Sequence, residues 1–177
     1  MAHNELIDYF DDNGAVLGFC ERDEAEDKNL TTANAIVFVF TPDGDVWLQH
    51  RAEDKKHYPG RWDTTACGGV VHGETALGAA QRELAEESGF DCQLEPADTF
   101  LNTFPDESGS LVRKRISHLF IGISSEHPQG NHEVQGFQLF KQSEALEQAN
   151  SYPEKFVPSM ALELGKAVLG FERLSAR

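Results

Sequence analysis

The stretch Gly68–Phe90, with the sequence GGVVHGETALGAAQRELAEESGF, decides the fold of this chain. Its second half predicts a helix over Glu74–Ser88, because Gly73 and Gly89 bound it and glycine commonly marks helix ends. Glycines before the helix allow the backbone to turn tightly and to approach a bound group closely. The stretch is therefore expected to form a glycine loop followed by a helix.

Three carboxylates lie on one side of this predicted helix. Glu86 and Glu87 follow Glu83 by three and four residues, so the three side chains project from neighbouring positions. Ala76 and Ala80 fall on the same stripe, which means that the carboxylates extend a face of small side chains suited to burial. An ordinary solvated helix face is the alternative, but the alanine stripe and the flanking glycines favour a site.

The chemistry of the three glutamates indicates a divalent cation. Like charges this close repel one another and raise each other's pKa values unless a cation lies between them. Their hard oxygen atoms suit Mg²⁺ or Mn²⁺, and no histidine or cysteine clusters with them to favour zinc. Arg82 lies four residues before Glu86 and is expected to hold that carboxylate by a bidentate contact. Such a cation would bridge phosphate oxygens and lower the pKa of a bound water.

The segments on either side of this stretch alternate between strands and helices. Ala35–Phe40 is a continuous apolar run, which is typical of a strand buried on both faces. Asp45–His50 follows the turn Pro42-Asp43-Gly44, so the two runs are expected to form a hairpin. Further strands are predicted over Val16–Phe19, Asp98–Phe104, Arg113–Ile123 and Gly136–Phe140, and helices over Ser143–Ala149, with Ser143 as N-cap, and Pro158–Leu169, with Pro158 in its first turn. This pattern predicts an α/β fold with a mixed sheet flanked by helices.

Length, charge and cysteine usage narrow the class of protein. The 177 residues fit a single domain, 1–177. Thirty Asp and Glu against fifteen Lys and Arg give a net charge of −15, which disfavours nucleic-acid polymers and anionic membranes as partners. The apolar runs are too short to span a bilayer and the N-terminus lacks the pattern of a signal peptide, so the expected location is cytoplasmic. Cys20, Cys67 and Cys92 are odd in number and widely spaced, which predicts reduced thiols.

The glycine loop and the acidic helix together resemble the Nudix box, GX5EX7REUXEEXGU, in which U is a bulky apolar residue. By this resemblance residues 68–90 are identified as the box of a Nudix hydrolase, and the order of predicted elements is similar to the Nudix α/β/α sandwich. The resemblance implies hydrolysis of a phosphoanhydride bond, with Mg²⁺ or Mn²⁺, in a nucleoside diphosphate derivative or a related small-molecule diphosphate. The matching positions are Gly68, Glu74, Arg82, Glu83, Leu84, Glu86, Glu87, Gly89 and Phe90.

The resemblance also implies roles for individual residues. Arg82 would orient the glutamates, while Glu74 would support the loop or join the metal ligands. One of the box glutamates is also a candidate general base, and because Nudix proteins are often dimers the resemblance leaves a homodimer open. The implied metal ligands are the carboxylates of Glu83, Glu86 and Glu87 and the backbone carbonyl of Cys67.

The block before the box resembles that of isopentenyl-diphosphate isomerase and of the isomerase-like Nudix hydrolases. An isomerase with Cys67 and Glu133 as its acid pair is therefore the main alternative function. Three departures favour the hydrolase. Gly69 stands where the isomerase has a metal-binding histidine, Asn131 replaces one of its downstream glutamates, and Leu30–Ile36 lacks its two upstream histidines. The residues that carry the resemblance are His50-Arg51, Lys55, Tyr58-Pro59-Gly60, Trp62-Asp63, Cys67-Gly68 and Gly73-Glu74.

Basic residues just before the box are candidates for substrate binding. The sequence places Arg51, Lys55, Lys56 and Arg61 in a basic cluster of a strongly acidic chain, and these residues are expected to contact substrate phosphates. The alternative is that they form local ion pairs with Glu53 and Asp54, their neighbours in the sequence.

Other candidates lie farther from the box. Glu133 precedes a predicted strand and is a candidate general base, with a surface carboxylate as the alternative. Trp62, Phe104 and Phe137 are candidates for stacking on a base, although aromatic residues on strands more often belong to the core. A non-catalytic nucleotide-binding regulator is a further alternative, and the intact box glutamates count against it.

Overall fold

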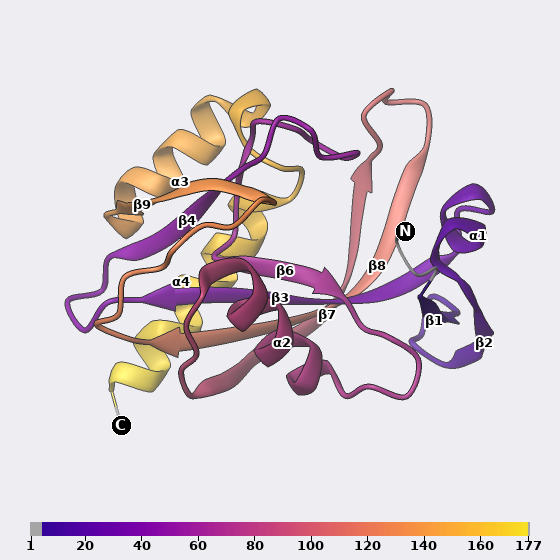
Figure 1. The fold of residues 1–177 in the computed structure, drawn as a ribbon, viewed down its shortest axis with the longest axis horizontal. Helices are drawn as coiled ribbons and strands as arrows, with labels where there is room; N and C mark the ends of the chain where they lie inside the picture. Colours follow the sequence, from indigo (N-terminus) through magenta and orange to yellow (C-terminus); the bar gives the residue numbers. More distant parts are fainter. Residues whose placement is uncertain (1–4, 177) are drawn as a thin grey trace.

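The computed structural model of the protein describes residues 5–176, and Figure 1 shows its elements in chain order. Within these residues the strands form one nine-stranded mixed sheet, and no helix is long and apolar enough to cross a membrane. The elements are β1 (Leu6–Phe10), β2 (Val16–Glu21), α1 (Arg22–Asp27), β3 (Thr31–Phe40), β4 (Val46–Arg51), β5 (Trp62–Asp63), β6 (Ala66–Gly69), α2 (Ala76–Ser88), β7 (Leu94–Pro105), β8 (Val112–Ile123), β9 (Val134–Phe140), α3 (Gln142–Ser151), the 3-10 helix η1 (Pro153–Lys155) and α4 (Met160–Ser175).

Strand β3 is the centre of the sheet. It runs parallel to β8 and antiparallel to β1, β4 and β6. Its pairing with β6 places Ala35 opposite Gly68 and Ile36 opposite Cys67. The glycine loop is thereby fixed against the most buried strand of the protein, and α2 leaves this loop on one side of the sheet.

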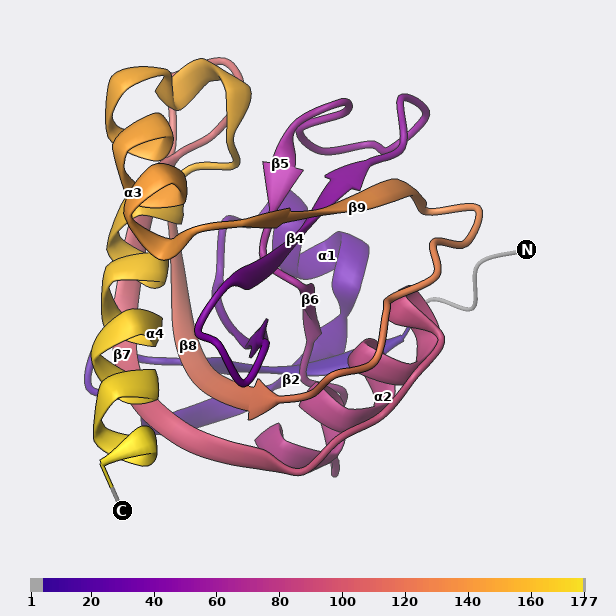
Figure 2. The same cartoon turned by 90° about the vertical axis from the view of Figure 1, so that its left-hand side faces the viewer.

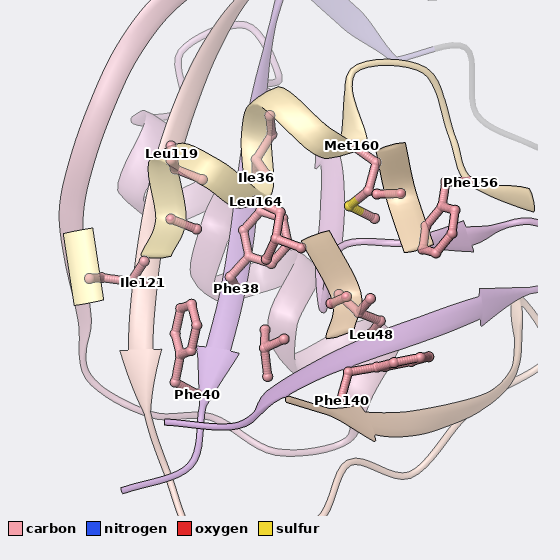
Figure 3. Packing of buried hydrophobic residues seen from close by; sticks show 14 residues of the cluster. Ile36, Phe38, Phe40, Leu48, Leu119, Ile121, Phe140, Phe156, Met160 and Leu164 are labelled. Carbon is pink, nitrogen blue, oxygen red and sulfur yellow. The ribbon is translucent and has the colours of Figure 1, made fainter. Parts of the chain in front are cut away.

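Alternate residues of β3 face two separate cores, as the continuous apolar run predicts. Ile36, Phe38 and Phe40 pack in a cluster with residues of α3 and α4, which Figure 3 shows from close by. Ala35 and Val37 face the other side and pack against α2. Figure 2 shows α3 and α4 on one side of the curved sheet and α2 on the other. The predicted α/β/α sandwich is confirmed.

The predicted helix boundaries needed correction at their N-termini. Helix α2 begins at Ala76 rather than at Glu74, because Thr75 caps it by accepting a hydrogen bond from Gly78 N at 3.0 Å. Its C-terminal end is confirmed, with Gly89 in the left-handed conformation at φ 72°. The prediction of Ser143 as N-cap of α3 is wrong, since the helix begins one residue earlier and has no side-chain cap. Pro158 likewise lies before α4, whose N-cap is Ser159 at φ 70°.

The remaining differences lie in short elements and in pairing. The predicted hairpin exists only next to its turn, where Val39 and Phe40 pair with Trp47 and Val46, and β4 then pairs with β9 and β5. The elements β1, α1, β5 and β6 were not predicted. β5 has two residues, and the Ala-Cys-Gly-Gly sequence of β6 carries no strand pattern. The pairing of β6 with β3, rather than its own sequence, makes it a strand.

Candidate functional site

Glu83 lies directly against the backbone of the glycine loop. A Cβ atom built on Gly68 would stand 1.8 Å from Glu83 Oε1, so no larger residue fits at this position while Glu83 stays in place. Arg82 Nη1 donates to the same Oε1 at 2.6 Å, and Oε2 accepts no hydrogen bond from the described residues. Burial raises the pKa of Glu83, although Arg82 opposes this shift. Gly68 therefore makes room for the mostly buried carboxylate of Glu83, which Arg82 contacts through one oxygen.

Glu87 is the most deeply buried glutamate of the box, at 3 % exposure. Its Oε2 accepts hydrogen bonds from Gln49 Nε2 at 2.9 Å and from the backbone N of Cys67 at 3.0 Å. Burial raises the pKa of Glu87 to about 8, and the nearby charges of Glu83 and Asp63 add to this effect. Both hydrogen bonds fall on Oε2, so Oε1 has no hydrogen-bond partner in the part of the chain that the structure describes.

Arg82 ties the glycine loop to α2. Its Nε and Nη2 atoms donate to the two oxygens of Glu74 at 3.0 Å each, and Nη2 also donates to the carbonyl of Gly69 at 3.1 Å. Glu86 is only a distant partner, at 3.6 Å from Nη1. The predicted bidentate contact of Arg82 with Glu86 is therefore wrong, because the loop brings Glu74 closer than the next turn of the helix. The role of Glu74 in supporting the loop agrees with this geometry.

Replacing Arg82 by lysine is expected to loosen the loop. Lysine keeps the charge but loses the planar fork that bonds Glu74, Glu83 and Gly69 together. We expect the Arg82→Lys variant to lose about 2 kcal/mol of unfolding free energy in urea titrations, since charge-assisted hydrogen bonds contribute about 1.5–3 kcal/mol each. The matched control is Arg173→Lys, whose arginine makes one exposed hydrogen bond to Ala97 O. Equal stability of both variants would contradict the tethering role.

A cavity of about 470 Å³ opens beside the box glutamates, which is within the usual size range of ligand pockets. Seven Lys and Arg side chains line it beside nine Asp and Glu side chains, a higher share of basic residues than the fifteen against thirty of the whole chain. A second, smaller cavity adjoins Glu86 and Glu133. The Lys and Arg residues that line the main cavity are Arg22, Arg51, Lys55, Arg82, Arg113, Lys114 and Arg115.

Arg51 and Lys55, two of the predicted phosphate-binding residues, line this cavity. They do not pair with Glu53 or Asp54. Arg51 forms an ion pair with Asp63 at 2.7 Å, and Lys55 pairs with Glu133. These partners come from β5 and from the residue just before β9. The alternative of local ion pairs with Glu53 and Asp54 is therefore wrong for these two residues.

Glu133 lies at the candidate site, whereas Arg61 does not. Arg61 is not among the cavity residues, because it donates to the Phe156 carbonyl at 3.3 Å and lies over the Tyr58 ring. The structure therefore does not bring Arg61 to the candidate site. Glu133 lines both cavities, and its ion pair with Lys55 lowers its pKa. Of the three aromatic candidates, Phe104 lines the main cavity, whereas Trp62 packs against Phe140 in the core.

The donor atoms of the box fit a hard divalent cation. Glu83 and Glu87 each keep one carboxylate oxygen without a hydrogen bond from residues 5–176, and burial raises the pKa of both. Oxygen ligands of this kind suit Mg²⁺ or Mn²⁺. Their side chains do not enclose an ion as they stand, since no three acidic, histidine or cysteine side chains among residues 5–176 converge closely enough.

Glu163 on α4 is a cavity residue that sequence reasoning missed. It is 6 % exposed, and its Oε1 accepts a hydrogen bond from Asn102 Nδ2 of β7 at 2.7 Å. Burial raises the pKa of Glu163 to about 8, with a further contribution from Asp63. A glutamate inside an otherwise apolar helix face was the available signal. Gln49, which holds Glu87, was likewise a polar residue on a buried strand.

Glu163 is expected to make the protein less stable as the pH rises. The pKa of a glutamate in an unfolded chain is about 4.3. Between about pH 4.3 and pH 8 the folded state therefore holds a proton that the unfolded state has lost. The stability contributed by this proton is complete below about pH 4 and is lost progressively toward pH 8. Glu163→Gln removes the titration. We expect the variant to gain on the order of 3 kcal/mol relative to the wild type between pH 5 and pH 8 in urea titrations. Parallel pH profiles of the unfolding free energy for Glu163→Gln and wild type would contradict this prediction.

Comparison with known proteins identifies the family of the chain. The NUDIX domain family matches residues 30–160. An isopentenyl-diphosphate Delta-isomerase of Pectobacterium atrosepticum is 32% identical over 147 residues, covering 82% of each chain, and one of Streptomyces griseus is 34% identical over 137 residues, covering 76% of this chain and 70% of the relative.

Solved structures share the fold at lower identity. The Deinococcus radiodurans protein DR0079 superposes with a TM-score of 0.76 at 19% identity, covering 92% of this chain and 99% of the other. An Ap4A hydrolase of C. elegans has a TM-score of 0.55 at 20% identity, covering 81% of this chain and 97% of the other. The family match spans well over half of the chain and includes the glycine loop and the acidic helix. The chain therefore belongs to the NUDIX domain family.

Proposed function

We propose that this protein hydrolyses a phosphoanhydride bond in a nucleoside diphosphate derivative or a related small-molecule diphosphate, with Mg²⁺ or Mn²⁺. The observation that carries the proposal is the presence of the box carboxylates and of a cluster of basic side chains in one cavity. The α2 carboxylates Glu83, Glu86 and Glu87, where a cation is needed, line the same cavity as seven Lys and Arg side chains, which can donate to phosphate oxygens. An anionic substrate is otherwise difficult to bind for a chain of net charge −15.

Glu83, Glu86 and Glu87 would hold the cation, with the backbone carbonyl of Cys67 as a further proposed ligand. When bound, the cation supplies charge neutralisation of the diphosphate and a lower pKa for a water ligand. Arg82 holds Glu83 in place through a bond of 2.6 Å and fixes the loop through Glu74. Gln49 and the amide of Cys67 hold Glu87. These contacts orient the carboxylates before substrate enters.

The reaction transfers one phosphoryl group to water. The water oxygen forms a bond to phosphorus, the bridging P–O bond breaks, and the leaving phosphate keeps the electron pair. Glu133 is our candidate to accept the proton of the water, because it lines both cavities together with the box glutamates. Arg51 and Lys55 line the same cavity and are our candidates to bind the phosphate oxygens.

Isomerisation of isopentenyl diphosphate is the second candidate. It is favoured by the names of the similar curated proteins and by the position of Cys67 and Glu133 on one cavity. The surroundings of the thiol count against it, because a hydrocarbon substrate needs an apolar pocket. The thiol lies 3.5 Å from Asn34 Nδ2, and the charges of Asp63, Glu163, Arg115 and Glu87 act on it.

A substrate panel separates the two candidates. The purified protein is incubated with Mg²⁺ or Mn²⁺ and with nucleoside diphosphates, nucleoside triphosphates, dinucleotides, nucleotide sugars or isopentenyl diphosphate, and the products are resolved by mass. We expect metal-dependent cleavage of a phosphoanhydride bond. Conversion of isopentenyl diphosphate without release of phosphate would overturn the proposal in favour of the isomerase. Binding of a nucleotide without cleavage of any compound would overturn it in favour of a regulator.

A further inference from the structure

Two arginines of β8 line the cavity and take no part in the proposed hydrolysis. Arg113 and Arg115 are two residues apart on this strand, so their side chains leave the same face of it. Both side chains are half-buried. Figure 1 shows the β7–β8 hairpin, which carries them, extending past β6 on the side of the molecule where α1 lies. The two arginines therefore belong neither to the box nor to the block before it.

Arg113 and Arg115 differ from the other basic residues of the cavity in having no carboxylate partner. The other five each form an ion pair, as Lys114 does with Asp12 at 2.6 Å. Neither Arg113 nor Arg115 forms one within residues 5–176, although nine Asp and Glu side chains line the same cavity. Arginine stays charged at every physiological pH, and a charge taken partly out of water without a partner is costly. The pair is therefore suited to an anion that enters the cavity.

The contacts of the two guanidinium groups orient them but leave their charge uncompensated. Arg113 Nη1 donates to the backbone carbonyl of Glu26 at 2.8 Å and to Asn29 Oδ1 at 3.1 Å, which are both neutral acceptors. The guanidinium carbon of Arg115 lies 5.6 Å from the centre of the Phe104 ring. Arg115 makes no hydrogen bond within the described residues, yet none of its nitrogen atoms is buried. Its N–H donors are thus open to a ligand.

The register of the sheet sets the distance between these arginines and the box. Arg115 pairs with Thr32 of β3, and Asn34, two residues along β3, pairs with Gly69 of β6. With strands about 4.8 Å apart and a rise of about 3.3 Å per residue, the Cα atoms of Arg115 and Gly69 lie about 12 Å apart.

The side chain of Arg115 also leans away from the box. It contacts Phe104 of β7, and β7 lies beyond β8 as seen from β3. A diphosphate, whose two phosphorus atoms share one oxygen, is too short to contact both the box and this guanidinium group. The anion that fits Arg113 and Arg115 therefore belongs to another part of the substrate.

Two guanidinium groups match the charge of a phosphate monoester better than that of a carboxylate. A phosphate monoester carries a charge of about −1.5 to −2 near neutral pH and offers three strong acceptor oxygens. A carboxylate carries a single negative charge and two oxygens. The planar fork of arginine bonds phosphate oxygens in pairs, which favours this group where two arginines share one face.

We propose that Arg113 and Arg115 form a subsite for a phosphate monoester on the organic half of the substrate, apart from the diphosphate at the box. In a nucleotide this group is a phosphate on the 2′ or 3′ oxygen of the ribose. The inference rests on the proposed function, because it takes the diphosphate to lie at the box. It makes nucleoside diphosphate derivatives with a phosphorylated ribose the preferred substrate class.

Binding of adenosine bisphosphates tests the subsite without any cleavage. Calorimetry in Mg²⁺ compares AMP with adenosine 2′,5′-bisphosphate and with adenosine 3′,5′-bisphosphate. We expect at least one bisphosphate to bind about tenfold more tightly than AMP, which is the effect of one charge-assisted hydrogen bond. Equal or weaker binding of both bisphosphates, or no binding of any of the three compounds, would overturn the subsite.

Arg115→Gln links the gain in affinity to this arginine. An added phosphate without a partner is repelled by a chain of net charge −15, so the variant is expected to bind neither bisphosphate more tightly than AMP. Its affinity for AMP should equal that of wild type, which also shows that it is folded. Arg173→Gln removes the same charge from an exposed position of α4 and should keep the gain.

Two outcomes of the variant decide the assignment. A gain that survives Arg115→Gln would overturn the role of Arg115. If Arg115→Gln does not fold, the wild-type comparison of the bisphosphates with AMP still decides, because the absence of a gain there overturns the subsite.

Hydrolysis of matched diphosphates separates this inference from the function on which it rests. NADPH differs from NADH by a 2′-phosphate, and coenzyme A differs from dephospho-coenzyme A by a 3′-phosphate. We expect the phosphorylated member of at least one pair to be cleaved about tenfold faster at low substrate concentration. Equal rates within both pairs would leave the hydrolase standing and overturn the subsite. Tighter bisphosphate binding that depends on Arg115, in a protein that cleaves no phosphoanhydride, would support the subsite and overturn the hydrolase.

Discussion

Glu87→Gln is expected to reduce metal-dependent hydrolysis by about 1,000-fold, which is the scale on which removal of one well-placed electrostatic group acts in enzymes. Glutamine preserves the size of the side chain and keeps an oxygen that accepts from Gln49 and from the Cys67 amide. It removes the negative charge that a divalent cation needs. The measurement is the initial rate at saturating Mg²⁺ for wild type and variant.

The loss is expected to come without unfolding. Burial already raises the pKa of Glu87 to about 8, so the neutral amide resembles the protonated form that the folded protein favours. The melting temperature of Glu87→Gln at pH 7 should therefore equal or exceed that of wild type. Glu147→Gln, an exposed change on α3, is the matched control and should keep full activity. A Glu87→Gln variant with wild-type rates would show that Glu87 holds no cation in the reaction.

Gly68→Ala is expected to be the second most damaging single change, with about a 100-fold loss of activity from misplaced groups. The added Cβ would lie 1.8 Å from Glu83 Oε1 and 2.0 Å from its Cδ, closer than any atoms can approach without bonding. Glu83 must therefore leave its position, and its bond with Arg82 goes with it. The measurement is the metal-dependent rate together with the dependence of that rate on Mg²⁺ concentration.

Gly165→Ala on α4 is the matched control for this change. A Cβ at Gly165 meets no atom within 4 Å, and alanine favours helix over glycine by about 1 kcal/mol. We expect this control to be fully active and at least as stable as wild type. If Gly68→Ala kept its rate and its Mg²⁺ dependence, the position of Glu83 against the loop would be irrelevant to the reaction.

Local patterns in the sequence predicted the centre of the molecule well. The apolar run of β3 and the bounded helix α2 both depend on periodicity within one segment, and the structure confirms both. The box glutamates line one cavity for the same reason, since their spacing places them on one side of α2. Helix starts were less predictable, because Thr75 and Ser159 compete with neighbouring residues that are equally plausible caps.

Contacts between distant segments were not predictable from the sequence. Arg82 selects Glu74 over Glu86 because the loop folds back onto the helix, which spacing along a helix cannot reveal. The Lys55–Glu133 and Asn102–Glu163 pairs join residues far apart in the sequence, and they require the pairing of β4 with β9 and the packing of α4 on β7.

The most direct test of the central claim is one reaction in deuterated water, followed by phosphorus and proton NMR. The wild-type protein is mixed with Mg²⁺, CDP, ADP and isopentenyl diphosphate, and Glu87→Gln serves as the blank. Our account predicts loss of nucleotide phosphoanhydride signals, release of phosphate, and no deuterium in the isopentenyl group. Deuterium incorporation into an allylic diphosphate, with every phosphoanhydride bond intact, would contradict the account and identify the protein as an isomerase.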